Sequence, residues 1–382
     1  MPIFDQGYQH WSGELSGHAW RWLAISRQGV RVGLKNRFLR LLLFVAWVPA
    51  LALVLMLCAW GLLERGSAMV SGFTRLIALM QPSLVMDPKY YRADIWRLSY
   101  GYFLQIELWV SMILVLLAGP SLISQDLRFN ALPLYFSRPL RRIDYFLGKL
   151  GVIVAFLAMV VILPAIVAYI FGLLFSLDIT ILRDTFGILL ASIGYGVIIA
   201  LSAGLLILAL STLSRNSRYV ALLWIGLWFV GSIVGHALQA VDSQDRRQAY
   251  YNKITVTRPM GRDDASLSNA ERQRQRREWH RAIQRANDEY RVAELEFSKN
   301  DWRPLVSYSA NLSRLGQQLL HTNQTWAKLA AMQPDPASRD RILALYMGPQ
   351  FPWYWSAGVL VGLFGLSACI LNFSVKSLDK LK

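Results

Sequence analysis

Residues 124–149 read SQDLRFNALPLYFSRPLRRIDYFLGK, a basic stretch that lies between two long apolar runs. The run before it extends from about Tyr102 to Ile123, and the run after it from about Leu147 to Phe175. At ~1.5 Å of rise per residue, each run is long enough for a helix that crosses most or all of the ~30 Å hydrocarbon core of a bilayer. The charged stretch is too polar for that environment, so it predicts a surface loop between two transmembrane helices.

Four further apolar runs in the chain have a similar length. We expect the six spans at about Leu39–Leu63, Tyr102–Ile123, Leu147–Phe175, Phe186–Leu210, Tyr219–Leu238 and Trp353–Phe373. The composition agrees, because 54% of the 382 residues are hydrophobic and only 17% are charged. The polar and aromatic start of the chain is not typical of a signal peptide, so the first run is expected to stay as a span. The sequence therefore predicts an all-α integral membrane protein with six transmembrane helices.

These spans divide the chain into four parts. We expect a cytosolic N-terminus in residues 1–38, five transmembrane helices in 39–240, a polar extracytosolic region in 241–352, and the sixth helix with a cytosolic tail in 353–382.

The orientation follows from the positive-inside rule, by which short cytosolic connections collect Lys and Arg. Residues 124–146 and 211–218 fall on one side of a six-span chain and are basic, whereas the 176–185 loop on the other side holds only Arg183 as a cation. We expect a prokaryotic plasma (inner) membrane protein with both termini in the cytosol. The net charge of +16 is largely explained by this topology, so no nucleic-acid partner is expected.

Residues 17–37 carry hydrophobic side chains that alternate with Arg and Lys and include Trp20 and Trp22. A basic amphipathic helix with tryptophans lies in the membrane interface, with its cations toward anionic lipid headgroups. We expect such an interfacial helix here; the alternative is an ordinary basic segment that only obeys the positive-inside rule.

The polar region between the fifth and sixth runs has a helical pattern. Ser268 and Glu271 have capping-box spacing, and an apolar stripe with alternating spacings of four and three follows from Trp279 to Phe297. A second stripe runs from Leu312 to Leu329. We expect the two helices to pair as an extracytosolic helical hairpin. Residues 265–332 could then bind an extracytosolic protein, although the Arg-rich start of the first helix is typical of a solvated face.

Motifs for catalysis are not found in this sequence. It has no phosphate-binding loop, because Gly148-Lys149 is followed by Leu150 and lacks the earlier glycine of that motif. It also has no G-x-S-x-G or H-E-x-x-H motif, and its five histidines are dispersed without the spacing of metal ligands. We therefore expect no enzyme activity, no metal site and no cofactor in this chain.

Two polar residues in the apolar runs are candidates for an intramembrane site. Glu107 lies in the second run, and His236 lies near the outer end of the fifth. An acidic group at mid-membrane costs ~2.5–3.5 kcal/mol even on insertion scales, so its presence suggests a function. The alternative for Glu107 is a position near the interface, where it pairs with headgroups or a neighbouring helix.

The 124–149 segment combines turn-forming prolines with arginines, which can hold carboxylates on a partner surface. The string from Leu132 to Lys149, LPLYFSRPLRRIDYFLGK, preceded by SQDLR at 124–128, resembles the segment after the second span in permeases of type-2 ABC exporters. The six spans and the N-terminal interfacial helix are also similar to that family. The resemblance covers about two thirds of the chain. One departure is the long polar region at 241–352, where the family has short re-entrant helices.

The resemblance implies that 124–149 is a coupling helix that sits in a cleft of a separate ATPase subunit. The implied coupling residues are Asp126, Arg128, Arg138, Pro139, Arg141, Arg142, Asp144 and Lys149. ATP and Mg would bind to the ATPase, and a second permease subunit would complete a homodimer or heterodimer in the lipid. The expected function is coupling of ATP hydrolysis to export or to mechanical transmission across the membrane. The alternative is a non-transporting scaffold or sensor that displays the helical hairpin.

Overall fold

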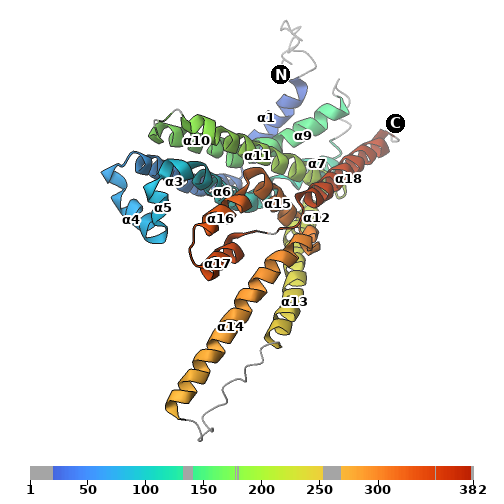
Figure 1. The fold of residues 1–382 in the computed structure, drawn as a ribbon. Coiled ribbons are helices and arrows are strands. Elements are labelled where there is room, and N and C mark those ends of the chain that lie inside the picture. Colours follow the sequence, from blue (N-terminus) through green and yellow to red (C-terminus); the bar gives the residue numbers. More distant parts are fainter. Residues whose placement is uncertain are drawn as a thin grey trace, which may run out of the picture.

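The computed structural model describes residues 20–131, 141–176, 178, 180–252, 268–348 and 350–379. Every regular element in these residues is a helix, and none of them forms a strand. A bundle is formed by α3 (Trp47–Glu64), α6 (Pro88–Ala118), α10 (Leu163–Ser176) and α11 (Thr180–Thr212), and α13 (Gly231–Asn252) and α14 (Asn269–Phe297) project from it as an arm (Figure 1).

Six helices are long and apolar enough to cross a membrane, so the predicted all-helical six-span fold is confirmed at that level. They cover Arg37–Glu64, Pro88–Arg128, Ile143–Ser176, Thr180–Thr212, Ser217–Ala249 and Trp353–Phe373. If all six cross, the two ends of the chain lie on one side of the membrane. In Figure 1 the N and C marks lie at the same end of the molecule as α1 (Arg21–Gly33).

The second span begins earlier than the sequence predicts, at Pro88 rather than near Tyr102. Proline is well placed at the first helical position, and the Asp87 side chain accepts a hydrogen bond from the Tyr90 amide to cap the helix. The charged residues Arg92 and Asp94, typical of a loop in a hydropathy scan, lie in the helix. They are tolerated there because both have ionic partners within the protein.

Two spans contain π-helical turns. In the third, α9 (Arg142–Leu157) passes through a π turn at Ala158–Ile162 into α10, and in the fifth a π turn at Gly226–Val230 joins α12 (Ser217–Ile225) to α13. The first of these turns directly precedes Pro164, whose ring nitrogen cannot donate a hydrogen bond to the preceding turn. The wider turn is the local form in which this helix accommodates its proline.

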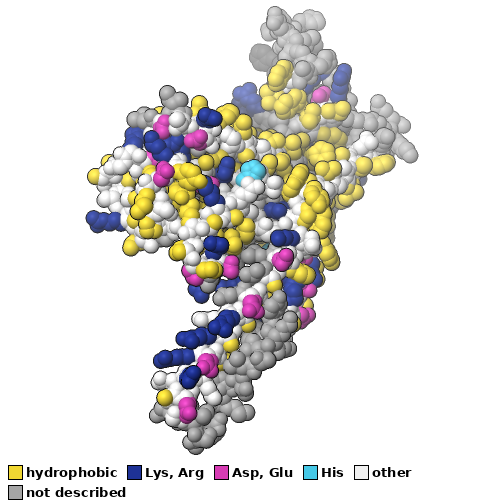
Figure 2. Space-filling model, viewed as in Figure 1, with side chains coloured by type: hydrophobic (Ala, Val, Ile, Leu, Met, Phe, Trp, Pro, Cys, Tyr) yellow, Lys and Arg dark blue, Asp and Glu magenta, His cyan; other side chains and the backbone are white. Residues whose placement is uncertain are grey.

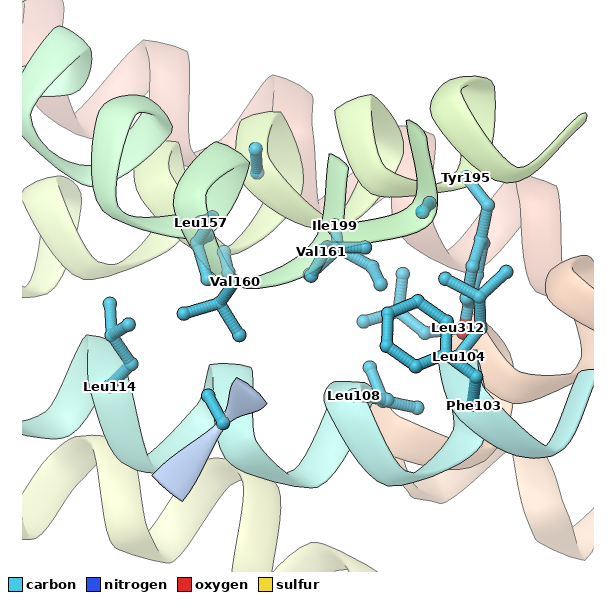
Figure 3. Close-up of a cluster of buried hydrophobic side chains, with 14 of the residues drawn as sticks. Phe103, Leu104, Leu108, Leu114, Leu157, Val160, Val161, Tyr195, Ile199 and Leu312 are labelled. Atoms are coloured by element: carbon cyan, nitrogen blue, oxygen red, sulfur yellow. The ribbon is translucent and has the colours of Figure 1, made fainter. Parts of the chain in front are cut away.

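The core of the bundle is aliphatic and aromatic (Figure 3). Leu104, Leu108 and Leu114 of α6 face Val160 and Val161 of the π turn across the layer. Further along, Tyr195 of α11 and Leu312 of α15 (Tyr308–Leu320) close the same cluster. Lipid tails are as apolar as these side chains, so van der Waals packing, rather than exclusion of water, holds the helices together in a membrane.

The predicted pairing of the two external helices is wrong, because α14 lies against α13 rather than α15. The Tyr290 hydroxyl donates to the Ser243 carbonyl at 3.0 Å, and Arg246 pairs with Glu294 at 3.2 Å. The stripe from Leu312 to Leu329 was predicted as one helix, but it is broken at His321 into two. Periodicity marks an apolar stripe but cannot identify its partner, and for α14 the fifth span offers one by continuing as α13. Figure 2 shows basic and acidic side chains along the visible face of the arm.

The second external helix, α15, instead returns into the bundle. It packs on α6, α11 and α18 (Trp353–Asp379), and the Tyr308 hydroxyl lies 2.9 Å from Ser202 Oγ of α11. The chain then turns at His321, which has a φ of 54°, and continues as α16 (Thr322–Ala331). A short helix pair that enters the bundle between the fifth and sixth spans is therefore present, in addition to the arm.

An ion cluster joins the spans at the end of the bundle opposite α1. The Arg92 guanidinium donates to Glu64 through Nε at 2.8 Å and through Nη2 at 2.7 Å, and the two side chains are only 1% and 2% exposed. Arg92 also contacts Asp178 at 3.1 Å and the Thr180 hydroxyl at 3.1 Å. The Ser176 hydroxyl donates to Glu64 at 3.1 Å. One guanidinium thus ties together α3, α6 and the connection between α10 and α11.

We expect Glu64→Gln to destabilise the fold by about 3–5 kcal/mol, because it leaves a buried guanidinium without its main counter-charge. Lys89→Gln is the control: Lys89 is 64% exposed and lies 3.5 Å from Asp178, so its removal should change stability by less than about 1 kcal/mol. Denaturant unfolding of both variants in detergent measures the difference. Equal stability of Glu64→Gln and the wild type would contradict the importance of this pair.

Candidate functional site

The candidate site lies at the end of the bundle near α1, where the second span ends and the third begins. The second span breaks at Gly119-Pro120 and resumes as α7 (Ser121–Arg128). Ser211 of α11 closes this break. Its hydroxyl accepts from the amides of Ile123 at 3.2 Å and Ser124 at 3.0 Å and donates to the Pro120 carbonyl at 3.0 Å. The start of α7 is therefore fixed to the fourth span.

The far part of α7 is fixed to the third span by Asp126. Its Oδ2 lies 2.7 Å from Lys149 Nζ and accepts a hydrogen bond from the Tyr145 hydroxyl, also at 2.7 Å. Lys149 and Asp126 are only 12% and 16% exposed, and Tyr145 is buried. A partly shielded ion pair with an added hydroxyl donor is stronger than a free surface pair. Asp126 and Lys149, predicted to face a partner, thus face each other and hold the two spans together.

The start of α9 is capped from within. The Arg141 amide donates to Asp144 Oδ2 at 3.2 Å, and a carboxylate in the first turn also favours the helix dipole. The Asp144 side chain is therefore engaged in capping its own helix. Between α7 and α9, Asn130 has a left-handed φ of 51° and turns the chain away from the helix end.

The remaining predicted coupling residues divide into two groups. Arg128 and Arg141 are exposed at the ends of the two helices, with the Arg128 guanidinium over the Phe129 ring at 5.6 Å. Arg138 and Pro139 lie outside the described residues, and the side chain of Arg142 does as well. Among the described side chains, Arg128 and Arg141 are thus the predicted residues positioned to contact another protein.

The helix α1 is seated directly on α9, as Figure 1 shows. Two glycines of α9 permit this approach: a Cβ on Gly148 would lie 2.6 Å from Ile25 Cβ, and one on Gly151 would lie 2.2 Å from Ser26 Oγ. The Ser26 hydroxyl donates to the Gly148 carbonyl at 2.9 Å. Small residues at such contacts are how membrane helices bring their backbones close together.

The interfacial-helix prediction covered residues 17–37, and the structure has a helix at Arg21–Gly33. Its docking on the third span was missed. A signal for it was present in the spacing of Ser26, Gly29 and Gly33, which places small side chains on one face. The cations Arg27 and Arg31 are exposed on the other side, where they remain available to headgroups.

Neither of the two candidate intramembrane residues, Glu107 and His236, lies at the junction of α1, α7 and α9. Glu107 is 0% exposed inside the bundle, and neither of its carboxylate oxygens has a hydrogen-bond donor among the described residues. Its position excludes a headgroup partner in this arrangement. His236 is exposed on α13, and its Nδ1 lies 2.7 Å from the Ser232 carbonyl. Glu107 therefore stays a candidate polar site, and the structure gives His236 a local hydrogen bond.

A metal site is not evident in the described part of the chain, where no group of three or more His, Cys, Asp or Glu side chains could hold an ion. No protein-family model matches the chain, and no curated protein is significantly similar to it. The functional argument therefore depends on the geometry of the junction formed by α1, α7 and α9.

We expect Gly151→Leu to displace α1 from α9, because the added side chain would overlap Ser26. Gly194→Leu is the matched control, since a Cβ on this helical glycine meets nothing within 4 Å. Hydrogen exchange of residues 21–33 in the solubilised protein measures the docking. Exchange should rise in Gly151→Leu alone, and equal exchange in both variants would contradict the role of the glycine contact.

Proposed function

We propose that the chain is the transmembrane permease subunit of an ATP-binding-cassette transporter, with ATP and Mg bound by a separate ATPase subunit. The observation that carries the proposal is the double anchoring of α7. Ser211 fixes its start to the fourth span, and the Asp126–Lys149 pair fixes its far part to α9 of the third span. The similarity of residues 124–149 to the coupling segment of type-2 exporter permeases supports the same function.

Such anchoring is what force transmission requires. A push on a loosely attached loop is absorbed by the loop, whereas a push on a segment clamped to its neighbours moves them as one body. Here the clamped neighbours are the second, third and fourth spans together with α1. Binding and release of ATP in the partner would bias two arrangements of this unit, because the ATPase has a different shape in each state.

The charges at this end suit a partner surface that carries carboxylates. Arg128 and Arg141 are exposed, and arginine forms two-pronged hydrogen bonds with carboxylates. The basic character of this end also supports its assignment to the cytosol of a prokaryotic cell, where an ATPase would have access to ATP. A second permease subunit would complete the assembly in the plane of the lipid.

The arm formed by α13 and α14 favours a second candidate function, that of a non-transporting scaffold or sensor. The arm projects from the bundle and is held by the Arg246–Glu294 pair and by the Arg246 guanidinium 3.6 Å from the Phe297 ring centre. In a transporter the same arm would pass motion to an extracytosolic protein.

The test is the association of the full chain with an ATPase subunit from its own host. We expect the wild type to copurify with an ATPase, and the double variant Arg128→Glu/Arg141→Glu to lower that affinity at least about tenfold, because two interfacial cations become repulsive. Arg276→Glu/Arg277→Glu on the exposed face of the arm is the control and should bind normally. Failure of the wild type to bind any ATPase would contradict the proposal.

Replacement of residues 247–289 by a short Gly/Ser linker separates the two candidate functions, since it removes the arm and leaves α15 in place. A transporter should retain ATPase activity that depends on the permease, whereas a scaffold or sensor should lose its function while Arg128→Glu/Arg141→Glu has no effect. Measurement of ATP hydrolysis in reconstituted vesicles distinguishes these outcomes.

A further inference from the structure

Two adjoining cavities lie on the side of the bundle remote from α1. The larger has a volume of about 600 Å³ and is bounded by α3, α6, α16, α17 (Pro336–Tyr346) and the short helices α4 (Ser71–Met80) and α5 (Pro82–Met86). The smaller has about 300 Å³ and lies between α6, α11, α15 and α16. They share the side chains of Leu98, Tyr102, Trp326 and Tyr346 as a common wall. Both volumes fall in the ~300–1,000 Å³ range of small-molecule sites.

The larger cavity is apolar and elongated along the helices. Its lining extends from Pro49 to Trp60 on α3 and from Ile95 to Ile106 on α6. At ~1.5 Å per residue each of these stretches covers about 16 Å, close to half of the ~30 Å hydrocarbon core. The cavity is therefore about as long as one leaflet is thick, and its apolar lining suits an acyl chain.

The smaller cavity is mixed in character, more polar than the larger one, and has no charged residue in its lining. Gln317 and Asn323 line it, and Gln317 Oε1 and Asn323 Nδ2 are buried without a hydrogen-bond partner among the described residues. The side-chain oxygen of Asn323, Oδ1, already has a partner, because it accepts a hydrogen bond from the Gly348 amide at 3.3 Å. The wall of this cavity thus contains one acceptor and one donor that have no partner among the described residues.

The lining residues of both cavities include no Lys, Arg, Asp or Glu. Lys328 and Asp94, which neighbour lining residues in the sequence, pair with each other, and Lys328 also lies 4.2 Å from the Tyr90 ring centre. A charged headgroup would therefore enter the smaller cavity without a counter-charge, which is costly in a site shielded from water. Hydroxyl, amide and ester groups fit it without that cost.

The shared wall provides the junction between tail and head. Trp326 and Tyr346 stack with ring centres 4.3 Å apart and an interplanar angle of 12°. Amphipathic aromatic rings of this kind occupy the level where lipid tails meet polar groups. Trp60 lies in the apolar lining, and its buried indole N–H has no hydrogen-bond partner among the described residues.

We propose that these cavities form a binding site for an uncharged amphiphile of the leaflet remote from α1, with one acyl chain in the apolar cavity and a hydroxyl- or amide-bearing head in the polar one. The site belongs to this chain alone and does not require the coupling to an ATPase proposed above. It can therefore be tested on the purified full-length protein, and either proposal can fail without the other.

The experiment uses the full chain in phosphatidylcholine nanodiscs with a diacylglycerol that carries a photoreactive diazirine in one acyl chain. After illumination, mass spectrometry maps the labelled peptides. Label should concentrate on residues 49–60 and 95–106 and should be displaced by unlabelled diacylglycerol. Label spread evenly over exposed apolar residues such as Leu222 and Leu223 would mean surface lipid only, and would overturn the proposal. Phosphatidic acid with the same chains should label these peptides weakly, and equal labelling would overturn the uncharged head.

Matched variants test the two cavities separately. Ala52→Phe fills the apolar cavity and should abolish the specific label, whereas Leu55→Phe, on the same helix but outside the lining, should leave it unchanged. In Gln317→Leu, the diacylglycerol concentration needed to displace the label should rise about fivefold, which corresponds to the loss of one neutral hydrogen bond. Gln318→Leu should leave that concentration unchanged. Persistence of the label in Ala52→Phe, or equal competition in both glutamine variants, would contradict the assignment of tail or head.

Discussion

The bidentate pair between Arg92 and Glu64 is the contact on which the arrangement of the bundle most depends. A buried guanidinium is stable only when several acceptors surround it, and here the acceptors come from two separate parts of the chain, the end of α3 and the connection between α10 and α11. Satisfying one arginine therefore fixes the ends of α3 and α6 and the connection between α10 and α11 relative to each other. Cores made only of aliphatic side chains tolerate sliding more readily, because such contacts carry no direction.

A second set of polar contacts, at the opposite end of the bundle, likewise connects separate spans. Asp126, Tyr145 and Lys149 join the second and third spans, and Ser211 joins the second and fourth. Polar contacts thus hold the two ends of the bundle, while van der Waals packing fills the middle around the π turn at Ala158–Ile162. Rigidity at both ends is what the proposed transmission of force would require of this bundle.

The return of α15 into the bundle creates both the walls and the polarity of the cavities beside α6. Ser313 of α15 donates to Gln105 at 2.7 Å, and the same helix brings Gln317 into the wall of the smaller cavity. A buried amide is stable only if its polar atoms are satisfied, and the Gln317 oxygen has no partner among the described residues. The proposed amphiphile site is in this sense a consequence of how α15 returns to the bundle.

Hydropathy and periodicity were sufficient for the helical class, the six spans and the amphipathic character of the first helix, because these properties depend on local composition and on the length of an apolar run. The start of the second span was misplaced, since the ionic partners that allow Arg92 and Asp94 inside a helix are distant in sequence. The basic 124–149 segment was identified as a candidate, but the sequence could not show that Asp126 and Lys149 face each other.

The sequence by itself determined the helical class, the six apolar runs and the apolar stripes of several helices. Only the tertiary structure decided the partners of those faces: α14 lies against the extended fifth span, α1 against the glycines of α9, and α15 against the bundle. The physical reason is that an apolar stripe or a charge is stable only against a complementary surface, but the local sequence does not specify where in the chain that surface lies. Ionic, hydrogen-bonded and close glycine contacts supply that specification, and they exist only once the helices have assembled.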